Sequence, residues 1–180
     1  MRLYRFSPIH NQKQLFGALQ HIHYACGNLC HELIGECLPN AGNLGLFCHY
    51  NDEYETLIRF RQELTEDSDN PQQKYFRLHR PIKFEATENI PETTYTHLYI
   101  RKPDPYRHHV GDVDFYLSPS QYNQYKSRIE ATDGIEGIRI FPRRDLDMIE
   151  LHDPDYDVLG YISTSQMVQK THTNQGESNI

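Results

Sequence analysis

The sequence has no tryptophan, no long apolar run and no excess of positive charge. None of its 180 residues lies in a segment approaching the roughly 18–20 apolar residues of a membrane-spanning helix. The first ten residues lack the apolar core of a secretory signal. Lys and Arg number 18 against 25 Asp and Glu, so the formal net charge is -7. The absence of a long apolar run argues against a membrane protein. A chain with this excess of acidic residues has no broad basic surface to neutralise phosphates, which argues against binding of duplex nucleic acid.

The common catalytic motifs are also missing. The sequence contains no GxSxG, GxxxxGK[ST], GxGxxG or HExxH, so serine hydrolase, P-loop, Rossmann and zincin assignments lose their usual support. Cys26, Cys30, Cys37 and Cys48 include no CxxC pair, which argues against a zinc ribbon and a thioredoxin-type site. His21, His23, Cys26, Cys30 and His31 could suggest a metal site. Cys26 lies on the apolar stripe of a predicted helix and Cys30 borders it, however, which favours core packing. We therefore expect a cytoplasmic protein with free thiols.

Aromatic residues supply much of the apolar surface that a core needs. Its 13 Tyr and 8 Phe offset a mean hydropathy of -0.76, because each aromatic ring buries a large area. The length suits one domain, which we expect over residues 1–169. Residues 170–180 lack an apolar pattern and are expected to form a flexible tail. No internal repeat is visible in the sequence.

The order of predicted elements indicates an α+β protein. Strands follow from alternating apolar residues, and helices follow from apolar spacing and from capping residues such as Ser118 with Pro119 and Gln121. We expect a largely antiparallel sheet of about six to eight strands with about three helices packed on it. The predicted helices cover about 12–38, 53–65 and 119–131, and the predicted strands cover about 2–9, 44–50, 74–79, 82–85, 93–101, 109–117, 136–141, 147–151 and 157–162.

The strands at 93–101 and 109–117 are the clearest in the chain, and we expect them to pair as a hairpin. Side chains alternate across a strand, so the apolar sets share one face and the polar sets the other. A register with Arg101 opposite Val110 would set Tyr99 opposite Asp112 and His97 opposite Asp114. This polar face is the predicted site.

A third strand, at 147–151, would add Glu150 and His152 to the same face. Imidazole and carboxylate groups together suit a divalent metal, so the candidate ligands are Asp112, Asp114, Glu150 and His152. Without a metal, His97 or His109 would exchange a proton, with Asp112 and Asp114 as catalytic partners. The alternative is an ordinary solvated sheet face with cross-strand charge pairs.

The segment between the two strands concentrates positive charge in an acidic chain. Lys102 and Arg107 follow Arg101 and lie beside two histidines, and two prolines stiffen the backbone. We expect Arg101, Lys102 and Arg107, with Tyr99, to bind a small anionic or phosphorylated substrate. The alternative is a turn whose cations pair with nearby acids.

Together these features favour a small cytoplasmic enzyme, a hydrolase or a lyase, that acts on a small anionic molecule, with metal assistance left open. The alternative is a non-catalytic module that binds a protein partner or senses a nucleotide, since tyrosine is enriched in interfaces. A second copy of the chain is a further candidate partner. The sequence does not decide between these classes.

Overall fold

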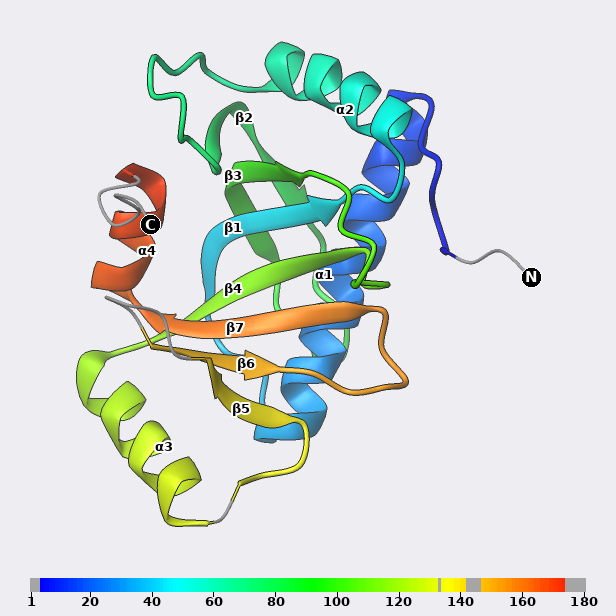
Figure 1. Ribbon diagram of the computed structural model, residues 1–180. Coiled ribbons are helices and arrows are strands. Elements are labelled where there is room, and N and C mark those ends of the chain that lie inside the picture. Colours follow the sequence, from blue (N-terminus) through cyan, green and yellow to red (C-terminus); the bar gives the residue numbers. More distant parts are fainter. Residues whose placement is uncertain (1–3, 133, 142–146, 174–180) are drawn as a thin grey trace.

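Seven strands form one sheet, and four helices accompany it in the described part of the chain (Figure 1). The computed structural model describes residues 4–132, 134–141 and 147–173. In chain order the elements are α1 (Gln12–Ile34), β1 (Asn40–Phe47), α2 (Asn51–Leu64), β2 (Phe76–Phe84), β3 (Thr93–Arg101), β4 (Gly111–Leu117), α3 (Pro119–Ala131), β5 (Ile138–Phe141), β6 (Met148–Leu151), β7 (Val158–Thr164) and α4 (Ser165–Thr173).

The sheet is mixed, so the expectation of a largely antiparallel sheet is wrong. Its strand order is β2-β3-β1-β4-β7-β6-β5. Strand β1 runs parallel to β3, and β4 runs parallel to β7, whereas the other neighbours are antiparallel. Parallel neighbours need a long connection, and α2 with β2 and α3 with β5 and β6 supply the two connections. The α+β class itself is confirmed.

The topology contains a repeat that the sequence does not reveal. The unit β1–α2–β2–β3 and the unit β4–α3–β5–β6–β7 each begin with a strand and a helix. In each unit the last strand returns to lie parallel beside the first. The two first strands pair antiparallel at the centre of the sheet. In this arrangement β1 corresponds to β4, as the first strands of the two units, and β3 corresponds to β7, as the last strands.

The predicted hairpin of β3 and β4 is wrong, because β1 lies between these strands. Gly45 of β1 is the Cα partner of both Tyr99 on β3 and Asp112 on β4. The connection from β3 to β4 arches over the end of β1 rather than making a tight turn. There the Phe47 amide donates to the Val110 carbonyl at 2.9 Å, and the amide of Cys48, just after β1, donates to the Arg101 carbonyl at the end of β3 at 3.1 Å. A strand from elsewhere in the chain thus separates two strands that are consecutive in sequence.

Helix α1 covers one face of the sheet and holds much of the core. Asn11 caps it, with its side chain accepting from the Gln14 amide at 2.9 Å. The helix ends four residues earlier than expected at Ile34, because Gly35 adopts a left-handed conformation with φ of 92°. Its apolar stripe packs on the face formed by the alternate apolar residues of the strands, as the sequence predicts. These buried residues include Leu15, Leu19, Ile22, Cys26, Leu44, Leu98, Val113, Phe115, Ile149 and Leu151.

The opposite face of the sheet, here called the inner face, carries the predicted polar residues. Helix α4 lies against this face near β7, on the side of the sheet away from α1 (Figure 1). The sequence analysis did not predict α4, which includes residues 170–173 of the expected tail. Residues 174–180 of that tail lie outside the described residues. No helix among the described residues is long and apolar enough to cross a membrane.

Two local predictions need correction, and a third is confirmed. The described residues 4–9 of the first predicted strand are not a strand; Ile9 instead donates its amide to Glu53 at 2.9 Å. The strands predicted at 74–79 and 82–85 are one strand, β2, whose register shifts between Arg77 and Ile82. That irregularity includes Pro81, which has no amide hydrogen to donate to a neighbouring strand. The helix α3 follows its prediction, and Ser118 and Gln121 form its capping box.

The buried His23 makes folding stability depend on acid pH. His23 is 3% exposed, stacks on Phe84 and shares a 2.9 Å hydrogen bond with the Tyr95 hydroxyl. Burial lowers its pKa to about 4, whereas an unfolded histidine titrates near 6.5. The unfolded chain therefore binds the proton more tightly than the folded chain. The contribution of neutral His23 to the free energy of unfolding is present above pH 6.5 and is lost as the pH falls toward 4.

Removing this titration is expected to make the protein less sensitive to acid. In His23→Gln, the free energy of unfolding should fall between pH 7 and pH 5 by about 2 kcal/mol less than in the wild type. Urea unfolding at both pH values measures the difference, and His10→Gln, at an exposed position, is the matched control. An equal loss in wild type and His23→Gln would contradict the assignment.

Candidate functional site

Two carboxylates and three phenols meet on the inner face, and we call this set the inner-face cluster. Asp112 and Asp114 lie two residues apart on β4, so both point to the same side of the sheet. They are 6% and 4% exposed, respectively. Tyr161 on β7 is the Cα partner of Asp114. Tyr99 on β3 and Tyr75, next to β2, complete the cluster, with their ring centroids 5.3 Å apart.

Gly45 makes room for the Asp112 carboxylate. A Cβ atom at Gly45 would lie 1.8 Å from Oδ1 of Asp112. The carboxylate thus lies against the backbone of β1 in space that any other residue would fill. Gly45 of the first topological unit therefore positions an acid of the second unit.

Two of the phenols, those of Tyr75 and Tyr161, remain protonated at neutral pH. Burial raises the pKa of Tyr75 well above its usual value, and the charges of Asp112 and Asp114 raise it further. Burial, followed by the charges of Asp112 and Glu150, also raises the pKa of Tyr161. Since phenols donate hydrogen bonds and carboxylates accept them, the cluster combines donors with proton acceptors in a buried site.

A polar chain links the cluster to α4. Asn43 of β1 donates from Nδ2 to Oδ2 of Asp114 at 2.7 Å. Its Oδ1 accepts from Nε2 of His172 at 2.5 Å, because a carbonyl oxygen can only accept. The His172 ring stacks on His97, with centroids 3.6 Å apart and planes 17° apart. The predicted His97 is therefore joined to Asp114 through two residues that the sequence did not single out.

Both stacked histidines are neutral at neutral pH. Burial, and then the neighbouring His97, lowers the pKa of His172 to about 4. Burial lowers the pKa of His97 as well, and the nearby Arg77 adds to this effect. A neutral imidazole has a ring nitrogen able to accept a proton, so His97 suits the role of a base.

Glu150 borders the cluster, as the Cα partner of Tyr161 on β7, whereas His152 lies apart from it. Glu150 is fully buried on the inner face of β6, where Arg139 contacts its Oε1 at 2.5 Å. His152 lies beyond the end of β6, and its amide donates to the Gly137 carbonyl. Within the part of the chain that the structure describes, no three His, Cys, Asp or Glu side chains are arranged to hold a metal ion. Metal binding at the predicted ligands therefore stays a prediction.

His109 lies at the other end of the central strands. The adjacent Val110 bonds to Phe47 at the end of β1, whereas His97 is level with Asn43 near the middle of that strand. Burial lowers the pKa of His109 to about 4, and the neighbouring charges of His108 and Arg107 lower it further. The structure thus separates the two histidines that the sequence offered as alternative bases.

The positive charges of the segment that joins β3 to β4 form ion pairs largely with an acid of the same segment. Arg101 contacts Asp104 at 2.8 Å, and Arg107 contacts the same carboxylate at 3.7 Å. Arg101 also lies 4.8 Å above the ring of Phe47. These contacts favour the alternative of a turn whose cations pair with a local acid, and Asp104 is the acid concerned.

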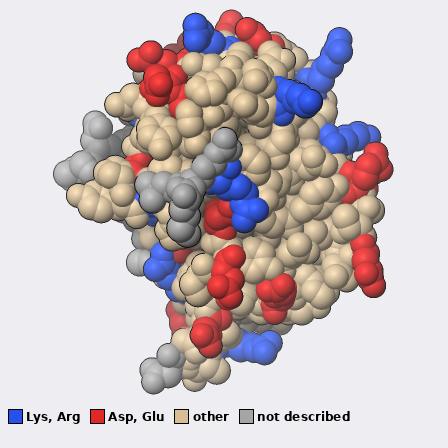
Figure 2. Space-filling view, turned by 90° about the vertical axis from the view of Figure 1, so that its right-hand side faces the viewer, with Lys and Arg blue, Asp and Glu red and all other residues tan. Residues whose placement is uncertain are grey.

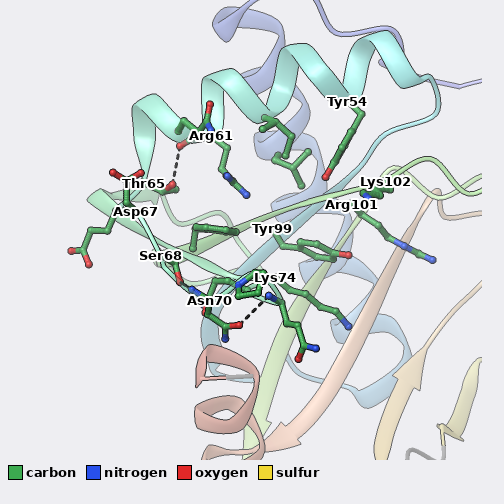
Figure 3. Close-up of a pocket in the computed structure, with 18 of the residues that line it drawn as sticks. Tyr54, Arg61, Thr65, Asp67, Ser68, Asn70, Lys74, Tyr99, Arg101 and Lys102 are labelled. Atoms are coloured by element: carbon green, nitrogen blue, oxygen red, sulfur yellow. Dashed lines mark hydrogen bonds between the residues drawn. The ribbon is translucent and has the colours of Figure 1, made fainter. Parts of the chain in front are cut away.

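A pocket of about 930 Å³ adjoins the cluster (Figure 3). It lies between α2, the segment 65–74 and the end of β3. Tyr99 belongs both to the cluster and to the pocket lining, so it connects the two. The predicted residues Arg101 and Lys102 line the pocket, whereas Arg107 is not part of its lining. A molecule bound there would contact the cluster through Tyr99, because neither Asp112 nor Asp114 is part of the pocket lining.

On the right-hand side of the molecule as seen in Figure 1, the surface has mixed charge. In the view turned by 90° from Figure 1, Lys and Arg are interspersed with Asp and Glu (Figure 2). That face therefore shows no broad region of one charge, in agreement with the small imbalance of the sequence.

Comparisons with known proteins establish the fold alone. No family model matches the chain, and no curated protein matches it. One solved structure, titled "Structural Genomics, Protein EC4020", is similar with a TM-score of 0.57 and 16% identity, over 97% of this chain and 99% of that one. At this identity the match shows a common fold and no function.

Two further structures are similar at lower scores. A glyoxalase/bleomycin resistance protein/dioxygenase superfamily member from Vibrio splendidus 12B01 has a TM-score of 0.37 and 8% identity, over 67% of this chain and 95% of that one. The fosfomycin resistance protein FosX from Listeria monocytogenes, complexed with Mn(II) and sulfate, has a TM-score of 0.25 and 13% identity, over 74% and 94%. Scores below 0.5 do not establish a common fold, so neither match enters the argument.

Proposed function

We propose that the protein is an enzyme that performs proton-transfer chemistry on a small anionic molecule at the inner-face cluster. The observation that carries the proposal is the burial of Asp112 and Asp114 among three phenols, on the sheet face opposite the core. Burying a carboxylate is costly, and proteins concentrate buried ionisable groups at functional sites.

The roles of the residues follow from their chemistry. Asp112, beside Gly45, is the base that removes a proton from the substrate. Tyr75 and Tyr161 donate hydrogen bonds to the oxygen on which negative charge develops. His97, neutral and stacked on His172, returns or removes a second proton. Hydrogen-bond donors fixed before the reaction stabilise such charge without reorganising during it.

This set of groups suits a lyase-type reaction better than hydrolysis. Removal of a proton beside a carbonyl or carboxyl group needs a base and donors to the resulting oxyanion, and the cluster contains both. Hydrolysis through a thiol finds no support at Cys48, because burial and the charge of Glu53 raise its pKa. The positive groups at the end of β3, Arg101 and Lys102, lie where an anionic part of the substrate would enter.

A screen in D₂O tests this proposal without a known substrate. The protein is incubated with a mixture of small carboxylated and phosphorylated molecules, and mass spectrometry follows each component. We expect at least one compound to gain a deuteron or to lose a neutral fragment. Asp112→Asn protein, purified in the same way, controls for contaminating enzymes. The absence of any mass change, or equal change with both proteins, would rule the proposal out.

A further inference from the structure

The pocket beside the cluster has two walls of different chemistry. Helix α2 supplies Tyr54, Ile58 and Arg61, and the sheet supplies Phe76 and Tyr99. Figure 3 shows Tyr54 and Arg61 reaching from α2 toward the sheet, with Tyr99 below them. A volume of about 930 Å³ lies at the upper end of the range of small-molecule sites, so the pocket has room for a molecule with several groups.

The aromatic side chains of the pocket suit a planar ring. Tyr54 and Tyr99 come from opposite walls, so a flat molecule can lie between their rings. Phe76 is already covered, because the Arg61 guanidinium lies 3.6 Å from its ring centroid. Stacking on aromatic side chains is the usual way in which proteins hold a heteroaromatic base, and it tolerates different bases.

The pocket is positive although the chain is acidic. Its lining has four cations, namely Arg61, Lys74, Arg101 and Lys102, and three acids, Glu66, Asp67 and Asp104, which gives 4 − 3 = +1. Glu66 also pairs with Arg77, outside the lining, at 3.6 Å. Including Arg77 raises the local sum to +2, against -7 for the whole chain. An anion is therefore favoured here over a cation.

Arg61 is the cation best placed to bind the anionic group. Its Nε atom is buried and has no hydrogen-bond partner among the described residues. Burial lowers the pKa of its guanidinium, although the neighbouring Tyr54 and Asp67 act in the opposite direction. A guanidinium removed from water gains most from an acceptor with several oxygens, and phosphate matches its planar geometry.

We propose that the pocket beneath α2 binds a nucleoside monophosphate, with the base between Tyr54 and Tyr99 and the phosphate on Arg61. The amides of Asn70 and Gln72 in the lining are the groups suited to the edge of the base, because such side chains both donate and accept. The inference rests on the proposed function in one respect only, that the bound nucleotide is the substrate of the adjoining cluster.

Calorimetric titration tests the chemistry of the ligand. The probes are the four common ribonucleoside monophosphates, adenosine and ribose 5-phosphate. We expect at least one monophosphate to bind about tenfold or more tightly than ribose 5-phosphate, which lacks the base, and than adenosine, which lacks the phosphate. Equal affinity for ribose 5-phosphate would overturn the role of the ring, and no binding of any of the four monophosphates would overturn the whole inference.

Variants test the assignment of the residues. Arg61→Met should weaken binding of the best monophosphate about tenfold or more, and Tyr54→Leu about fivefold or more. Arg59→Met is the matched control, because Arg59 lies on the same helix but is exposed and outside the pocket, so its affinity should equal that of the wild type. Circular dichroism confirms that each variant is folded. Unchanged affinity in folded Arg61→Met and Tyr54→Leu would contradict the placement.

The two proposals fail separately. Binding without any reaction in the wild type would overturn the catalytic proposal and leave the nucleotide pocket in place. Reaction of another compound, without binding of any monophosphate, would overturn the nucleotide pocket and leave the catalytic proposal in place.

Discussion

Replacing Asp112 with asparagine is expected to lower turnover of the substrate found in the D₂O screen by about 100-fold or more. Asparagine has nearly the same shape as aspartate and also fits beside Gly45, but its amide cannot accept a proton at neutral pH. The variant therefore removes the base and keeps the packing. The ratio of kcat/KM between wild type and variant, measured as the rate of deuterium exchange, gives the loss directly.

Two further variants make this result specific. Asp155→Asn, in the exposed turn 153–156, is the matched control and should keep full turnover. His97→Ala should also lose turnover, by a smaller factor than Asp112→Asn, because His97 handles the second proton. If Asp112→Asn and His97→Ala both retained the wild-type rate, the cluster would not be the catalytic site.

The sequence predicts which side chains share a face, because that follows from the alternation along each strand. Leu98 and Val113 lie in the core as expected, and His97 and Asp112 lie on the opposite face. The period of two holds whatever the neighbours of a strand are. This part of the prediction therefore survived although the strand pairing was wrong.

Strand order is a different kind of property, and the sequence did not reveal it. Strand β1 separates β3 from β4 by contacts between segments about 50 to 70 residues apart, such as Gly45 with Tyr99 and with Asp112. A polar β3–β4 hairpin satisfied every local rule equally well. The return of β3 beside β1 and of β7 beside β4 depends on how α2 and α3 pack, which no short segment encodes.

Asn43 and His172, the site residues that the sequence did not single out, escaped prediction for the same reason. Asn43 lies in a glycine-containing strand, and His172 lies in a segment without an apolar pattern. Neither has a local signal that separates it from an ordinary surface residue. Both join the site through long-range contacts, Asn43 with Asp114 and His172 with Asn43. Only the fold converts a polar sheet face into a partly covered site.

The central contact between the two topological units gives the largest stability effect that we expect. A Cβ atom at Gly111 would lie 2.3 Å from the Gly45 carbonyl oxygen of β1 and 2.4 Å from Cδ1 of Ile22 in α1. The carbonyl belongs to the middle of the sheet and cannot move away without breaking the pairing of β1 with β4. Gly111→Ala should therefore lower the free energy of unfolding by about 3 kcal/mol.

Gly17→Ala is the opposite case and serves as the control. Gly17 lies in α1, where the added Cβ would meet no atom within 4 Å apart from its chain neighbours and the backbone of its own helix. Alanine favours a helix over glycine by up to about 1 kcal/mol. The same substitution should thus stabilise at one position and destabilise at the other, in urea unfolding under identical conditions. Equal stability of Gly111→Ala and wild type would mean that β1 and β4 are not packed this closely. The junction that holds Gly45 against Asp112 would then lose its support, and the candidate site with it.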